Sequence, residues 1–523
     1  MNIAPRRFSR HRRSFLRGAG AAAAAPLLQL PGLALAQSAA SQGLLRAGIT
    51  GFNVINTLDP AKASLLSEFY VIWASFNSLL KFDAQMGLVP DLAESYAPVD
   101  GGFEFKLRRG VKFHDGSDMT ADDVKFTLER LADPATGSSN RGRFSGIREI
   151  RVLDDYRLQI LADHSRAILL SSLTNTRTGS QIVSRRAYER LGAAEFERRP
   201  VGTGAYRIMD WKANSVVELQ AHEAYFVSGK PRLARVSMPL IPEESSGMRA
   251  VLGGQLDLTS TAPFADVKSL ESRKDVRVFR STGLNNRYIT LNTRRAPFDD
   301  PHMRRAVSLA INRDVLVNAV LFGEGKASGS LLPPSLSGQD RLPELARFDA
   351  ERARAEFAKS RYKPGATGVV LGWGSAWWKR FAEIAVAQVN QVLGTRFTVE
   401  VYDSNTVYSR LKAGDYDAAV WGWLGLTDPD EYLGETLGTG KWRNFQGYSN
   451  PAVDELLEKG RDTVDRDERA RIYQRAEALA MEDMPAVPCF VSNIHNLASP
   501  RLQGFEQLPY GNYGDAFQNL TLA

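Results

Sequence analysis

Apolar residues recur along this chain with two spacings, one typical of strands and the other of helices. In "GGFEFKLRRGVKF" (Gly101–Phe113), Phe103, Phe105 and Leu107 alternate with polar residues, which predicts a strand buried on one face. "GDYDAAVWGWLG" (Gly414–Gly425) is almost continuously apolar, as is typical of a strand covered on both faces in a parallel sheet. Because such strands alternate with helical patterns along the chain, the sequence predicts an α/β fold.

Two helices can be located from the residues at which they begin. Thr120 followed by Asp123 is a capping-box pattern, which predicts a helix after Thr120. Asp300 is a candidate N-cap, and Pro301 suits the first position of a second helix. The apolar faces would consist of Val124, Leu128 and Leu131 in the first helix and of Met303, Val307, Ala310 and Ile311 in the second.

The N-terminal segment differs in composition from the rest of the chain. Residues 1–36 contain six arginines and no acidic residue, followed by an alanine-rich apolar run and the small residues of Ala34–Ala36. That order predicts an export signal cleaved after Ala36, and "RRSFLR" (Arg12–Arg17) resembles the twin-arginine pattern read by a translocase for folded proteins. We therefore expect a periplasmic protein.

Removing this segment changes what the net charge implies. It carries six of the 66 Lys and Arg residues, so 60 remain against 59 Asp and Glu, a net charge of +1. Binding to nucleic acid rests on an excess of cationic side chains, so no nucleic-acid partner is expected. Cys489 is the only cysteine, which excludes an internal disulfide.

Motifs for catalysis or metal binding are absent from the sequence. The histidines stand singly at positions 11, 114, 164, 222, 302 and 495, and no H-E-x-x-H, G-x-S-x-G or phosphate-loop pattern occurs. His114 lies at a strand end beside the turn Asp115-Gly116, where a turn-stabilising role is favoured over that of a ligand or base. We predict no catalytic residue, no metal and no cofactor. An exported hydrolase or cofactor-dependent enzyme remains the alternative.

Several stretches, taken in order, resemble one family. They are "LDPAKA" (Leu58–Ala63), "LVPDLAESY" (Leu88–Tyr96), Phe103–Arg130, "VGTGAYRIMDW" (Val201–Trp211), "GGQLDL" (Gly253–Leu258), Tyr288–Asp314, "LKAGDYDAAVWGW" (Leu411–Trp423) and "YSNPAVDELL" (Tyr448–Leu457). The chain resembles the extracytoplasmic solute-binding proteins of ABC importers, in the branch with oligopeptide-, dipeptide- and nickel-binding members (family 5). The resemblance covers nearly the whole mature chain.

The resemblance implies a two-lobed periplasmic-binding-protein fold with two crossover strands and an extra subdomain inserted in the first lobe. The expected division is a signal peptide at 1–36, lobe I at 37–81, 180–285 and 490–523, an inserted subdomain at 82–179, and lobe II at 286–489. It also implies a monomer that captures a peptide-like or other small solute and delivers it to a membrane permease without covalent chemistry. A chaperone or receptor on the same fold is a further alternative.

The ligand site is expected where strands end. Open α/β sheets bind ligands at the carboxyl ends of their strands. We predict that the strand Tyr416–Val420 runs into a turn at Trp421–Gly425, and that Val369–Leu371 runs into Gly372-Trp373. The candidate ligand-binding residues are Trp373, Trp421, Trp423, Leu424 and Leu426. Tryptophans here either stack on a ligand or fill the lobe core.

Two positions depart from the pattern of dipeptide-binding relatives. Those relatives carry an aspartate for the peptide amine where this chain has Leu426, and an arginine for the peptide carboxylate near the position of Gly372. A buried charged terminus without a counter-ion costs several kcal/mol. A zwitterionic dipeptide bound in the usual manner is therefore disfavoured. A peptide held differently, a modified peptide, or a neutral or sugar-like compound stacked on tryptophan remain.

Overall fold

The computed structural model describes residues 41–164, 166–337, 342–511 and 514–523. All of them fall within one compact unit, Ala39–Ala523. The predicted export signal, its twin-arginine pattern and the cleavage after Ala36 lie outside the described residues. Among the described helices, none combines the length and apolar character that a membrane span requires.

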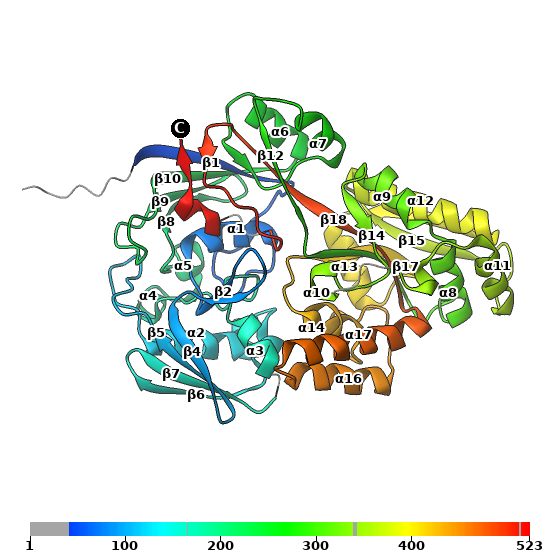
Figure 1. The fold of residues 1–523 in the computed structure, drawn as a ribbon, viewed down its shortest axis with the longest axis horizontal. Helices are drawn as coiled ribbons and strands as arrows, with labels where there is room; N and C mark the ends of the chain where they lie inside the picture. Colours follow the sequence, from blue (N-terminus) through cyan, green and yellow to red (C-terminus); the bar gives the residue numbers. More distant parts are fainter. Residues whose placement is uncertain (1–40, 165, 338–341, 512–513) are drawn as a thin grey trace, which may run out of the picture. The chain divides into compact units, whose positions relative to one another are not determined.

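A large mixed sheet runs through the described part of the chain (Figure 1). In sheet order its strands are β16 (Arg396–Tyr402), β15 (Thr367–Trp373), β17 (Ala418–Leu424), β13 (Asn285–Leu291), β18 (Ala486–Ala498), β11 (Leu258–Thr259), β1 (Ser41–Thr50), β10 (Leu233–Ile241), β9 (Val216–Ala221) and β8 (Tyr206–Lys212). Two further strands, β12 (Arg277–Thr282) and β14 (Gly325–Ala327), pair with β18.

The strand β18 belongs to both halves of this sheet. Its first residues, from Ala486 to Phe490, pair with β13, and its last residues, from Asn493 to Ala498, pair with β12. In Figure 1, β18 (orange to red) passes β12 at one end and β14 at the other. The consecutive strands β12 and β13 cross alongside it, so two chain segments connect the two halves.

The described residues form five hydrophobic cores, of which the three largest organise the fold. We call lobe I the part built on the core that extends from Leu45 to Leu520, and lobe II the part built on the core from Tyr288 to Phe490. The third core gathers residues between Ala61 and Ile182, and we call its surroundings the insert.

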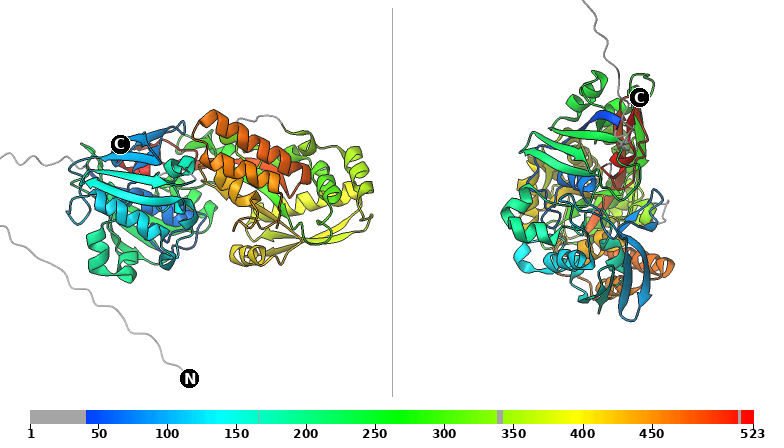
Figure 2. Two further views of the ribbon diagram at one scale, coloured as in Figure 1. Left: turned by 90° about the horizontal axis from the view of Figure 1, so that it is seen from below. Right: turned by 90° about the vertical axis from the view of Figure 1, so that its left-hand side faces the viewer.

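The helices distribute among these three parts. Lobe I contains α1 (Leu66–Ser75), α4 (Arg185–Leu191), α5 (Ala193–Arg198), α6 (Glu244–Leu252) and α7 (Phe264–Leu270). Lobe II contains α8 (Pro301–Ala310), α9 (Arg313–Leu321), α10 (Pro334–Ser337), α11 (Ala350–Lys359), α12 (Ala376–Leu393), α13 (Ser404–Ala413), α14 (Pro429–Tyr432), α15 (Gly434–Leu437), α16 (Pro451–Asp462) and α17 (Arg466–Asp483). Helices α16 and α17 (orange) run side by side in the left view of Figure 2.

The insert confirms the local predictions made for its sequence. It contains β2 (Leu80–Phe82), β3 (Leu88–Pro90), the four-stranded sheet of β4 (Ala93–Val99), β5 (Gly102–Leu107), β7 (Arg157–Ala162) and β6 (Ile147–Asp154), and helices α2 (Ala121–Ala132) and α3 (Arg166–Ser172). In β5, Phe103, Phe105 and Leu107 are buried. Helix α2 begins after Thr120, whose N–H donates to the Asp123 carboxylate (3.0 Å). Helix α8 likewise begins at Pro301 with Asp300 as its N-cap.

His114 has the architectural role that its sequence context favoured. Its Nε2 lies 3.0 Å from the carbonyl oxygen of Gly204, and its backbone N–H donates to Gly202. The ring packs edge-on against His222, with 5.0 Å between ring centres. Burial lowers the pKa of His114 to about 3, so the imidazole is neutral at physiological pH. It joins the insert to the loop before β8.

A buried glutamate makes lobe II sensitive to pH. Glu477 of α17 accepts the hydroxyl of Ser330 (2.9 Å) and the N–H of Leu331 (2.5 Å). Burial raises the pKa of Glu477 to about 7. The carboxyl of Glu477 therefore holds a proton in the folded chain at pH values where it would lose that proton in the unfolded chain. The contribution of Glu477 to the unfolding free energy is fully present below pH 4.5 and is lost as the pH rises through 7.

Replacing Glu477 with glutamine is expected to remove this pH dependence. The unfolding free energy of the wild type minus that of Glu477→Gln should fall by about 2 to 3 kcal/mol between about pH 5 and about pH 8. Urea unfolding of both proteins at several pH values measures it. A difference that does not vary with pH would contradict the assignment.

Candidate functional site

The end of β17 lies further along the chain than the sequence predicted. We expected the strand to stop at Val420 and a turn to begin at Trp421, but β17 continues to Leu424. The reason is pairing, because β13 continues alongside, with Asn285 opposite Leu424. Strand β15 similarly extends through Trp373 instead of ending at Leu371. Both predictions were wrong about the ends of the strands.

Three of the candidate tryptophans lie together at this edge. The ring centres of Trp373 and Trp421 are 4.8 Å apart, and those of Trp421 and Trp423 are 5.7 Å apart. Trp378 of α12 stacks on Trp373 at 4.5 Å. Trp373 and Trp423 are half-buried, whereas Trp421 is 4% exposed within the lobe II core.

The two other candidates occupy different surroundings. The side chain of Leu424 packs against the lobe I core, although its backbone belongs to lobe II. Leu426 is 2% exposed and is part of the lobe II core. Gly425 between them has a φ of +75°, and a Cβ there would lie 2.9 Å from the carbonyl oxygen of Tyr510. Only glycine fits this close approach between the end of β17 and the C-terminal segment.

Three arginines that the sequence reasoning missed converge on the same two residues. Arg287 of β13 donates from Nη1 to the carbonyl oxygen of Trp423 (2.9 Å). Arg177, from the insert, donates to the carbonyl oxygen of Leu424 (2.9 Å). The guanidinium of Arg443 lies 4.4 Å from the ring centre of Trp423. These arginines lie in three segments that are far apart in the sequence. The only sequence signal was at Arg287, a charged residue within an otherwise uncharged strand.

The positions of these arginines depend on the surrounding side chains. Arg287 lies over Trp378, at 5.4 Å from the ring centre, and crosses Gly422, where a Cβ would come within 2.8 Å of its Cδ. Arg443 is stacked between Trp423 and Trp442, the second at 4.6 Å. Burial lowers the pKa of Arg287 to about 10, and burial together with the neighbouring Arg143 lowers that of Arg443 to about 10. Both remain cationic at neutral pH.

Two polar links join the insert to lobe II next to this cluster. Arg143 forms an ion pair with Glu431 of α14. Ser171 of α3 donates to the Asp428 carboxylate (2.9 Å), which also binds Arg469 through both oxygens (2.6 and 2.8 Å). The end of β17 is therefore bordered by groups from lobe I, lobe II and the insert.

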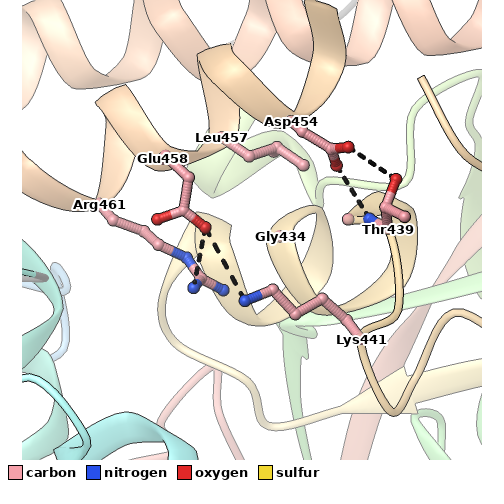
Figure 3. Close-up of a pocket in the computed structure, with 8 residues that line it drawn as sticks. Gly434, Thr439, Lys441, Asp454, Leu457, Glu458 and Arg461 are labelled. Carbon is pink, nitrogen blue, oxygen red and sulfur yellow. Dashed lines mark hydrogen bonds and ion pairs between the residues drawn. The ribbon is translucent and has the colours of Figure 1, made fainter. Parts of the chain in front are cut away.

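A separate pocket of about 240 Å³ lies within lobe II between α15 and α16 (Figure 3). It is lined by Gly434, Gly438, Thr439, Lys441, Asp454, Leu457, Glu458 and Arg461. Figure 3 shows Lys441 and Arg461 both directed toward Glu458, at 3.8 and 3.4 Å. Asp454 accepts the N–H and the hydroxyl of Thr439. The charges of this pocket pair with one another, so it is a weaker candidate site than the end of β17.

Metal binding finds no support in the part of the chain that the structure describes. No group of three or more histidine, cysteine, aspartate or glutamate side chains is placed there to hold an ion. Cys489 is free and buried, and burial raises the pKa of its thiol to about 12, so it is protonated at neutral pH.

Residues 87–444 match the model of the bacterial extracellular solute-binding proteins, family 5. The chain belongs to this family. The heme-binding protein A of Haemophilus influenzae is 28% identical to this family 5 protein over 483 residues, covering 86% of each chain. The glutathione-binding protein GsiB of Escherichia coli (strain K12) is 27% identical over 481 residues, covering 89% of this chain and 92% of its own.

Solved structures agree on the fold of this family 5 protein. The ABC transporter-associated periplasmic binding protein DppA of Helicobacter pylori, in complex with the peptide STSA, superposes with a TM-score of 0.81 at 23% identity, covering 92% of this chain and 98% of its own. The two-lobed α/β fold expected from the sequence is thereby confirmed. Family membership likewise confirms the expected function, that of the substrate-binding component of an ABC transporter. The family consists of exported solute-binding proteins, not enzymes.

Proposed function

We propose that this protein captures a small organic or peptide-like solute between its lobes in the periplasm and delivers it unchanged to an ABC permease in the inner membrane. The observation that carries the proposal is the end of β17, where side chains of lobe I, lobe II and the insert meet around Trp423 and Leu424. A ligand at this place could contact lobe I, lobe II and the insert at once, but only when the lobes are closed around it. Such contacts would stabilise the closed form over the open form.

The predicted ligand-binding residues take two roles in this proposal. Trp373 and Trp423 are half-buried, with Trp378 stacked on the first and Arg443 over the second, and we propose that their remaining exposed surface contacts the ligand. Leu424 contributes the contact to lobe I. Trp421 and Leu426 are buried beneath them and support their positions. No side chain is assigned a catalytic role, and no cofactor is required.

Export and assembly complete the proposal. The basic and apolar composition of residues 1–36 supports a twin-arginine-type signal cleaved after Ala36. The mature charge of about +1 gives no support to a nucleic-acid partner, and we propose that the protein acts as a monomer.

Mass spectrometry of the compound released when the purified protein is denatured tests the function. The released compound, together with heme and glutathione, for which two relatives are named, should then be tested for thermal stabilisation. A ligand at a hundred times its dissociation constant adds about 2.7 kcal/mol to the unfolding free energy. Trp423→Ala should lose this stabilisation, whereas Trp211→Ala, on the edge strand β8, should keep it. Conversion of the bound compound into a product would contradict the proposal.

A further inference from the structure

The three arginines at the end of β17 lack carboxylate partners. Among the ion pairs of the described residues, none involves Arg177, Arg287 or Arg443. Glu431 and Glu435 act on Arg443, but they already pair with Arg143 and Arg461. Glu68, which acts on Arg177, accepts three backbone N–H groups. The site therefore contains more positive than negative charge.

Burial makes this imbalance costly for the ligand-free protein. Arg287 and Arg443 are each 8% exposed, and the Nε atom of each is buried without a hydrogen-bond partner. A buried charge without its counter-ion strongly destabilises a protein unless another group supplies the opposite charge. Such unused donors next to half-buried tryptophans are suited to a ligand that brings acceptors.

Arg313, also in lobe II, is a buried arginine whose hydrogen bonds are all made within the chain, and it serves as the comparison. It is 2% exposed, and its Nε donates to the carbonyl oxygen of Pro488 (2.7 Å). Its Nη1 donates to the carbonyl oxygen of Ser308 (3.1 Å), and its Nη2 donates to the Ser308 hydroxyl (2.9 Å). All three nitrogens of Arg313 are therefore bonded within the chain. In Arg287 and Arg443 only Nη1 is bonded, to the carbonyl oxygens of Asn286 and Trp423 in the first and of Glu431 in the second.

We propose that the solute is a small organic acid with at least two negatively charged groups, which Arg177, Arg287 and Arg443 bind while Trp423 contacts its apolar part. The inference rests on the proposed function and specifies its substrate class. Two or three unpaired guanidinium groups balance two or three negative charges, and their planar forks suit carboxylate or phosphate oxygens. A dipeptide with one carboxylate and one ammonium group would leave the site unbalanced.

The first test measures the ligand-free protein. Arg287→Met and Arg443→Met remove a buried charge and retain the volume, and each loses fewer hydrogen bonds than Arg313→Met. Their melting temperatures should therefore lie well above that of Arg313→Met and close to that of the wild type. Arg313→Met leaves several carbonyl groups unpaired and should melt several degrees lower. If Arg287→Met and Arg443→Met lose as much stability as Arg313→Met, these arginines serve folding and the inference is wrong.

The second test measures binding by calorimetry. The compound released from the protein should carry two acidic groups, and Arg287→Met or Arg443→Met should weaken its binding about 10- to 100-fold each. Comparing the binding of glutathione with that of its diethyl ester tests whether the site requires carboxylates. Binding of pyrophosphate tests whether it accepts phosphate groups. A released compound that is neutral or cationic, or binding that esterification leaves unchanged, overturns the inference. If no compound is released, the melting temperatures of Arg287→Met and Arg443→Met relative to that of Arg313→Met decide whether the inference holds.

The outcomes separate this inference from the proposed function. A neutral solute bound and released unchanged contradicts the acidic substrate class but leaves the proposed function intact. An acidic solute that is converted into a product contradicts the proposed function, while the charge preference of the site remains.

Discussion

Replacing Arg130 with alanine is expected to lower the unfolding free energy by about 3 to 5 kcal/mol. Arg130 of α2 donates from both terminal nitrogens to the two carboxylate oxygens of Asp59, each at 2.6 Å. Both side chains are almost fully buried, at 6% and 1% exposure. Asp59 also accepts the N–H of Ala61, so it fixes the turn that leads toward α1. Without Arg130, a buried carboxylate loses its counter-ion.

Urea unfolding compares this variant with a surface control. Arg148 pairs with Asp163 in the insert, and their side chains are 52% and 58% exposed. Solvent screens such a pair, so Arg148→Ala should cost less than about 1 kcal/mol. Equal losses in Arg130→Ala and Arg148→Ala would show that burial of the Asp59 pair has no energetic consequence.

Replacing Asp428 with alanine is the second change with a large expected effect, again about 3 to 5 kcal/mol of unfolding free energy. The change leaves Arg469, whose side chain is 12% exposed, without its counter-ion, and it removes the N-cap of α14. Burial alone would raise the pKa of Asp428, but Arg469 and neighbouring hydrogen bonds hold it below its usual value. This stabilisation is therefore present above pH 3.8 and is lost as the pH falls below it.

Ser171→Ala is the matched control for Asp428→Ala. It removes only the hydroxyl that reaches Asp428 from α3, so it should cost about 1 kcal/mol and leave the ion pair with Arg469 intact. Chemical unfolding measures both variants. If Ser171→Ala destabilises as strongly as Asp428→Ala, the contact between the insert and lobe II, and not the ion pair, accounts for the loss.

Local features of the fold could be predicted because short stretches of sequence determine them. The capping box at Thr120 and Asp123 and the proline at position 301 fix helix starts regardless of distant residues. The alternation in β5 similarly identifies its buried face. The end of β17 could not be predicted, because it depends on how far β13 continues alongside, and β13 lies more than a hundred residues away.

The candidate site was predicted only in part for the same reason. Trp421 and Trp423 are close in sequence, so a strand brings them together. The guanidinium groups of Arg177, Arg287 and Arg443 come from the insert, from β13 and from the segment after α15. Each is an ordinary charged residue in its own segment. Their convergence depends on tertiary packing, for which a single sequence offers no pattern.

The sharing of β18 has a consequence for biosynthesis. Lobe I needs the last part of β18 beside β12, and its core includes Phe517 and Leu520 near the C-terminus. A ribosome produces these residues only after all of lobe II has been synthesised. The part of the protein that is synthesised first can therefore finish folding only after the second lobe has been made, and a translocase that accepts folded proteins must wait for that step.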